Sequence, residues 1–160
     1  MKEHLKEIGE KKFLLYAILF CFFGDLILAR FLFVKFADRQ TFNQMLQIAL
    51  AGQGAEMSNI ASADLDATYA LIVNTLLFFL TLMILLHLIN YFFFSKKKSF
   101  AFRYVTALVW VGSPSCIMLG LSYVRMPIVS LIFIVQGLLY GYVARGLWNY
   151  PWDKTKTQER

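Results

Sequence analysis

Charged positions are absent from three long stretches of this chain. Residues 67–94, 104–124 and 126–144 contain no Asp, Glu, Lys or Arg. A helix rises about 1.5 Å per residue and the hydrocarbon core of a bilayer is about 30 Å thick, so about 20 apolar residues are enough to cross it. The pattern therefore predicts three membrane-spanning helices, over 67–94, 101–123 and 126–147.

A fourth apolar segment, residues 13–35, carries Asp25 and Arg30 inside it. A central Asp or Arg costs about 2.5–3.5 kcal/mol on insertion scales, whereas each Leu, Ile, Phe or Val returns about 0.3–0.6 kcal/mol. The 15 residues of these apolar types between Phe13 and Val34 outweigh the two charges, and Arg30 can extend toward an interface. We therefore predict a span here as well.

The alternative for this segment is a cleaved signal peptide. Lys11 and Lys12 precede an apolar run, and Ala29 could stand at a cleavage site. No A-x-A pattern precedes a plausible cut, and Arg30 would directly follow it. We therefore favour a retained first span.

Basic residues predict the orientation of the four spans. Twelve Lys and Arg fall on one side of the predicted bundle: four in the amino-terminal tail (1–12), four in the turn at 95–100 and Arg103, and four in Arg145 and the tail 148–160. Three fall on the opposite side. Cytoplasmic segments carry the excess of basic residues. The expected fold is an all-α integral membrane four-helix bundle, up-down-up-down, with both termini cytoplasmic, in a bacterial inner membrane.

The opposite side receives one sizeable loop, residues 36–66. Within 41–51, apolar residues recur with the period of an amphipathic helix, and Gly52 and Gly54 follow. Such a helix lies on the membrane surface, caps the bundle or serves as a docking surface for an external partner.

Polar residues inside the spans are the candidates for function. Counting residues from the inner ends places four side chains near the midplane: Asp25, Thr81, Ser113 and Gln136. Ionisable groups at that depth face the bundle interior or a wet cavity. Asp25 is thus either a proton or cation site, with Gln136 and Ser113 as neutral partners, or a hydrogen-bonded carboxyl that fixes helix register.

Two further polar sets lie nearer the ends of the spans. Arg30 and Asn74 share a depth in the outer half, where Arg30 extends to water or binds lipid or another helix. The inner set consists of His87, Asn90, Tyr91 and Tyr140, which we interpret as an interhelical hydrogen-bond cluster in preference to a proton path.

Known catalytic and metal-binding patterns are absent from the sequence. The only other histidine, His4, lies in the amino-terminal tail, and the two cysteines lack C-x-x-C spacing. A triad of Ser115, His87 and Asp25 is disfavoured because the residue count separates Ser115 and His87 in depth. We expect no catalytic residues, cofactor or metal.

Small residues recur at a spacing of four and mark close helix contacts. They are Gly112, Cys116 and Gly120 on the third span, and Gly137 and Gly141 on the fourth. Pro114 should kink the third span. Gly137 and Gly141 suit packing against the third span, with self-association or a partner helix as the alternative.

The composition leaves little room for a soluble domain. The chain has 160 residues, 59% of them hydrophobic, and a net charge of +6, which fits anionic lipid headgroups better than nucleic acid. We expect a non-catalytic multi-pass subunit that associates with the bilayer and with other membrane proteins or itself. The alternative is a small oligomeric transporter or proton-linked channel centred on Asp25.

Overall fold

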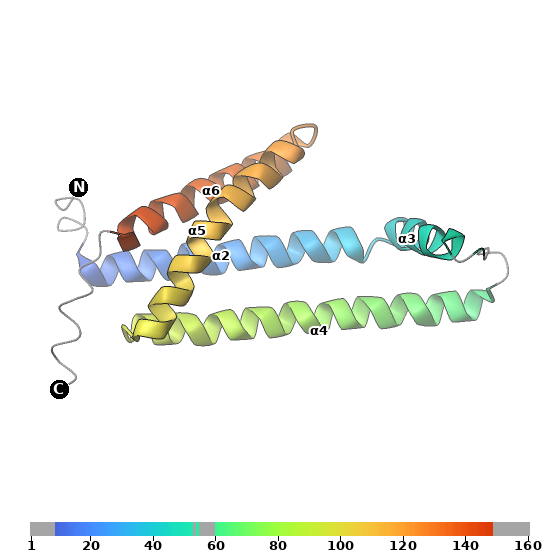
Figure 1. Cartoon of the computed structure of the whole chain (residues 1–160), viewed down its shortest axis with the longest axis horizontal. Helices are drawn as coiled ribbons and strands as arrows, with labels where there is room; N and C mark the ends of the chain where they lie inside the picture. Colours follow the sequence, from blue (N-terminus) through green and yellow to red (C-terminus); the bar gives the residue numbers. More distant parts are fainter. Residues whose placement is uncertain (1–8, 53, 55–59, 149–160) are drawn as a thin grey trace. The chain divides into compact units, whose positions relative to one another are not determined.

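All regular structure in the described residues is α-helical. The computed structural model describes residues 9–52, 54 and 60–148, in five helices that Figure 1 shows in chain order. They are α2 (Glu10–Phe36), α3 (Arg39–Ala51), α4 (Ser62–Ser95), α5 (Ser99–Ser122) and α6 (Pro127–Trp148). Much of the predicted tails 1–12 and 148–160, and part of the loop after Gly52, lies outside the described residues.

Four of these helices are long and apolar enough to cross a membrane: α2, α4, α5 and α6. The all-helical class and the four apolar helices predicted from the sequence are therefore confirmed. α4 is longer than its uncharged stretch because it starts at Ser62, and Asp64 in its first turn interacts favourably with the helix dipole.

The chain divides into two compact units, and the division passes through α2 and α4. Unit 1 consists of residues 1–24 and 88–160, and unit 2 consists of residues 25–87. Each unit has its own packing.

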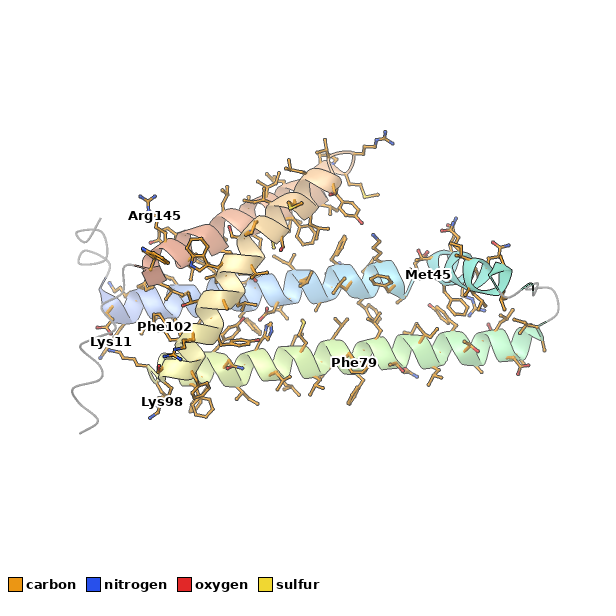
Figure 2. All side chains as sticks on the ribbon, viewed as in Figure 1. Lys11, Met45, Phe79, Lys98, Phe102 and Arg145 are labelled. Carbon is orange, nitrogen blue, oxygen red and sulfur yellow. The ribbon has the colours of Figure 1, made fainter. Side chains whose placement is uncertain are left out.

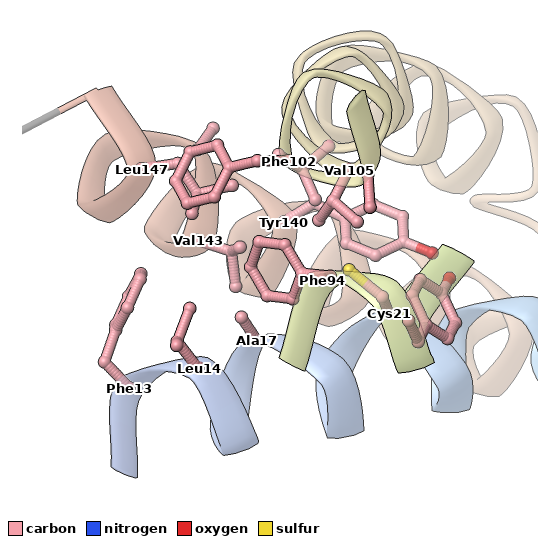
Figure 3. Close-up of a cluster of buried hydrophobic side chains, with 14 residues drawn as sticks. Phe13, Leu14, Ala17, Cys21, Phe94, Phe102, Val105, Tyr140, Val143 and Leu147 are labelled. Carbon is pink, nitrogen blue, oxygen red and sulfur yellow. The ribbon is translucent and has the colours of Figure 1, made fainter. Parts of the chain in front are cut away.

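Unit 1 has a well-packed apolar core, drawn in Figure 3. It is built from the first turns of α2, the last turns of α4, and the facing sides of α5 and α6. Phe13, Phe94, Val105 and Val143 are each at most 1% exposed, and the aromatic rings of Phe94 and Phe102 lie 5.2 Å apart between centroids. Such close packing of interlocking side chains is typical of protein interiors.

α5 and α6 form an antiparallel hairpin in unit 1. α5 ends with Tyr123 at its C-cap, where the Tyr123 N–H donates to the Gly120 carbonyl. α6 begins at Pro127. Proline suits the first turn of a helix, because a backbone N–H at that position would find no acceptor within the helix. Pro114 lies inside α5 without ending the helix.

The turn between α4 and α5 has an unusual residue in the left-handed region. Lys97 has φ of 58°, while the Lys98 N–H donates to the Phe93 carbonyl and the Lys97 N–H to the Phe94 carbonyl. This is the Schellman pattern, in which glycine usually takes the place of Lys97. The Lys97 ammonium forms an ion pair with Glu10 at the start of α2. Figure 2 shows Lys11, Lys98 and Arg145 at this same end of unit 1.

In unit 2, α3 is capped by Asp38 and contacts α4 through a pair of aromatic rings. The Asp38 carboxylate caps α3 by accepting from the Thr41 N–H at 2.7 Å. Phe42 is the buried residue of α3, and its ring meets the Tyr69 ring edge to face at 5.3 Å between centroids. The rest of α3 presents exposed apolar side chains, including Met45, which Figure 2 labels, and Ile48.

Candidate functional site

The buried carboxylate of Asp25 meets a histidine in unit 2. Asp25 Oδ1 lies 2.8 Å from His87 Nδ1, and the two side chains are only 4% and 13% exposed. The distance is that of an ion pair, although the ring N–H is not aligned on the carboxylate as in a linear hydrogen bond. The imidazole gives the buried carboxylate a polar neighbour, which an apolar surrounding alone would not supply.

The sequence placed His87 in a different cluster from Asp25. Residue counting put Asp25 near the midplane and His87 closer to the inner edge. That count treats both helices as upright and starting at one plane, and it ignores the reach of the two side chains. The direct contact in unit 2 means that this simple depth scale is too coarse to decide which polar groups meet.

Gln136 and Tyr140 contact the part of α2 that belongs to unit 1. Gln136 is 3% exposed, and its Nε2 donates to the Phe20 carbonyl at 2.9 Å. Gly24 leaves the space for these side chains, because a Cβ placed there would overlap the Tyr140 hydroxyl and lie 2.5 Å from Gln136 Nε2. Sequence reasoning did not single out Gly24, although a small residue beside an Asp within an apolar segment was a signal for close helix contact.

The other two residues predicted near the midplane have hydroxyls engaged with backbone. Ser113 Oγ donates to the Gly137 carbonyl at 2.8 Å, which joins α5 to α6. Thr81 Oγ1 donates to the Leu77 carbonyl within α4, and Thr81 is exposed. The Ser113 hydroxyl thus joins the two helices of the hairpin, and the Thr81 hydroxyl bonds to the backbone of its own helix.

The remaining members of the inner polar set belong to unit 1. Tyr91 is 2% and Tyr140 is 5% exposed, and both lie in its apolar core. Asn90 is partly buried. The two tyrosines are thus packed core side chains with polar ends.

Arg30 and Asn74 have exposed side chains on the long helices of unit 2. Arg30 lies on α2 and Asn74 on α4, within stretches that are otherwise apolar. A polar side chain on the outside of an apolar helix is costly in lipid unless it reaches water or meets another polar group. These two positions therefore mark surfaces where α2 and α4 offer hydrogen bonds outward.

The small residues of α5 and α6 lie where these two helices touch. A Cβ on Gly137 would come 2.9 Å from the Ser113 carbonyl oxygen, and a Cβ on Gly120 would come 2.9 Å from that of Ser130. Gly112 lies against the Tyr140 ring, while Gly141 faces only the Ser113 hydroxyl, at 3.2 Å. Cys116 is partly buried beside the core.

A second polar cluster, missed from the sequence, joins α3 to α4 in unit 2. The Arg39 guanidinium pairs with Asp66 at 2.5 Å and lies over the Tyr69 ring at 4.6 Å from its centroid. The Tyr69 hydroxyl donates to the Ala37 carbonyl at 2.5 Å. The sequence predicted only the amphipathic period of α3. These contacts join residues about 30 positions apart, and a local pattern carries no information about them. The cluster fixes the start of α3.

The described part of the chain brings together no group of three His, Cys, Asp or Glu side chains able to hold a metal ion. Comparisons with protein families, curated proteins and solved structures found no match to this chain. The chemistry at hand is therefore that of the Asp25–His87 pair and of the outward-facing polar positions.

Proposed function

We propose that this chain is a multi-pass protein of a bacterial inner membrane, with both termini on the cytoplasmic side. Four helices of sufficient length and apolarity support the membrane placement. The ion pair between Glu10 and Lys97 supports a common side for the start of α2 and the lysine-rich turn. Basic residues at that end are typical of cytoplasmic segments.

Within the membrane, we propose a non-catalytic subunit that associates with other membrane helices through α4. The observation that carries this proposal is the exposed amide of Asn74 in the uncharged stretch of α4. α4 buries only Leu80, Tyr91 and Phe94 of its 34 residues, whereas α6 buries eight of 22. An amide on such a surface gains a hydrogen bond when another helix covers it.

Crosslinking from α4 in native membranes tests this association. A photoreactive side chain at Asn74 should give a discrete product with a second membrane protein or a second copy. The matched control is Ile72, which is also exposed and lies at nearly the same depth but about 200° away around the helix. Equal products from both positions, or none from Asn74, would contradict a specific contact.

Substitutions at the same position measure the contribution of the amide. Asn74→Leu should weaken the association about 3- to 30-fold, because an interhelical hydrogen bond contributes about 0.6–2 kcal/mol in membranes. Asn74→Gln keeps an amide and should retain most of the association. Co-purification of differently tagged chains, or of the crosslinked partner, provides the measurement.

A second candidate function, proton-linked transport, is favoured by the Asp25–His87 contact. Both side chains are largely buried within long apolar helices, and an ionisable pair at such a place is a candidate proton relay. Transport would require an oligomer or a water-filled path to reach the pair.

Proton flux into vesicles separates the two candidates. If the pair carries protons, the purified chain in liposomes should dissipate an imposed pH gradient, and both Asp25→Asn and His87→Gln should abolish this. Thr81→Val, on the same helix as His87, should leave the flux unchanged because the Thr81 hydroxyl serves only its own helix in the described contacts. Absence of flux in the unaltered chain would remove this candidate.

A further inference from the structure

Unit 1 carries a groove between α5 and α6. Its volume is about 480 Å³, within the range of small-molecule sites. Trp110, Ser113 and Pro114 line it from α5, and Gly141, Arg145 and Trp148 line it from α6. All of these residues belong to unit 1.

The sequence explains why the hairpin is hollow at this place. Pro114 interrupts the regular hydrogen bonding of α5, and Gly141 contributes no side chain on the facing helix. Two tryptophans form a wall, with ring centroids 5.9 Å apart in an edge-to-face arrangement. Ser113, the polar residue of the α5 side, donates its hydroxyl to the Gly137 carbonyl. The inner surface of the groove is thereby left almost entirely apolar.

Charge is present at one end of the groove. Arg145 is exposed in the last turn of α6, close to Trp148, which is 75% exposed. Figure 2 shows Arg145 at the same end of unit 1 as Lys11 and Lys98. Tryptophan is favoured at the level of lipid headgroups, and a guanidinium matches the oxygens of a phosphate.

We propose that this groove binds an anionic phospholipid, with an acyl chain along the tryptophan wall and the headgroup phosphate at Arg145. A phospholipid combines the two chemistries that the groove offers, an apolar slot and a cation at its headgroup end. A partner helix would fill the slot but would place no anion at Arg145 unless it carried an acidic residue there. The proposal rests on the membrane placement proposed above.

Quenching of tryptophan fluorescence by brominated acyl chains tests the proposal in the full-length chain. Trp152→Phe leaves Trp110 and Trp148, which both line the groove, as the reporters in reconstituted vesicles. Brominated phosphatidylglycerol, as a minor component in phosphatidylcholine, should compete for the groove about fivefold better than brominated phosphatidylcholine, since one basic residue contributes about 1 kcal/mol to anionic-lipid attraction.

Variants of single arginines decide whether the groove is responsible. Arg145→Gln should abolish the preference for phosphatidylglycerol over phosphatidylcholine, and Arg145→Lys should keep most of it. Arg103→Gln is the matched control, because Arg103 is exposed on α5 but does not line the groove, and it should keep the preference. Equal quenching by both lipids in the parent, or an equal loss in Arg103→Gln, would overturn the site. Failure to insert into vesicles at all would instead overturn the membrane placement.

Discussion

At the scale of single residues, the most consequential contact is that between Asp25 and His87. Removing one member of a buried ion pair leaves the other without compensation, and this typically costs about 3–5 kcal/mol, whereas replacing both by apolar residues can be nearly neutral. The pair therefore makes a prediction about stability that is independent of transport.

We expect Asp25→Leu and His87→Leu each to lower the stability of the chain in detergent, and the double variant to lose less stability than the sum of the two single losses. The coupling energy should be about 1–3 kcal/mol, as for residues in direct contact. Unfolding by a denaturing detergent, followed by circular dichroism, measures it. Additive losses would mean that the 2.8 Å contact contributes nothing specific.

The helix cap formed by Asp38 leads to a prediction about how the stability of α3 depends on pH. The Thr41 backbone N–H and hydroxyl, which both donate to its carboxylate, hold the pKa of Asp38 below its usual value. A lowered pKa in the folded state means that the cap stabilises α3 fully above the ordinary pKa of an Asp, and that this stabilisation is lost as pH falls through the lower folded value.

Acidification should therefore loosen the first turn of α3, visible as faster amide hydrogen exchange and a shifted Thr41 amide resonance in NMR. Asp38→Asn is the control, because an asparagine side chain also caps helices but does not titrate. This variant should show no acid-dependent change at Thr41. The same acid response in the variant and the parent would assign it to another group.

At the scale of elements, the hydrophobic pattern predicted most of the helical structure. Long uncharged stretches indicate α4, α5 and α6, a long apolar segment indicates α2, and an amphipathic period indicates α3. These elements can be read locally because a helix makes its backbone hydrogen bonds within its own segment. The left-handed Lys97 could not be foreseen, since glycine is the usual residue in that motif. The ion pair with Glu10 joins residues remote in sequence, and the local pattern carries no information about it.

The α5–α6 contact allows a prediction with two neighbouring glycines. Gly137→Ala should destabilise the hairpin by about 1–3 kcal/mol, because its Cβ would press on the Ser113 carbonyl, which is backbone. Gly141→Ala should cost less, because only the Ser113 hydroxyl must move. Thermal unfolding of the two variants in the same detergent provides the comparison. Equal effects would indicate that the helices can separate freely at both levels.

At the scale of the whole molecule, the sequence predicted which segments form apolar helices better than it predicted which polar side chains meet. Asp25 was expected to face the interior and is buried, yet its contact, His87, was assigned to another cluster, and Gln136 contacts the Phe20 carbonyl. A count along one helix gives height but neither rotation nor stagger between helices. Gly24 was missed for the same reason, since its role depends on Tyr140 and Gln136 from a helix far along the chain.

The proposed arrangement of the whole chain across a membrane leads to the last prediction. After Cys21 and Cys116 are replaced by alanine, a single cysteine at Lys98 should react with an impermeant maleimide only from the cytoplasmic side. A cysteine at Asn43, on α3, should react only from the outside.

The physical reason is that α4 lies between these two positions with an uncharged stretch of about 40 Å, longer than the hydrocarbon core. The excess of basic residues at the α4–α5 turn is the reason to expect that turn on the cytoplasmic side. Intact cells and inside-out vesicles provide the two sides of the measurement. If both cysteines reacted from one side, α4 would not cross the bilayer. The proposed contact of Asn74 with another membrane helix, which requires α4 to lie in the bilayer, would then be contradicted as well.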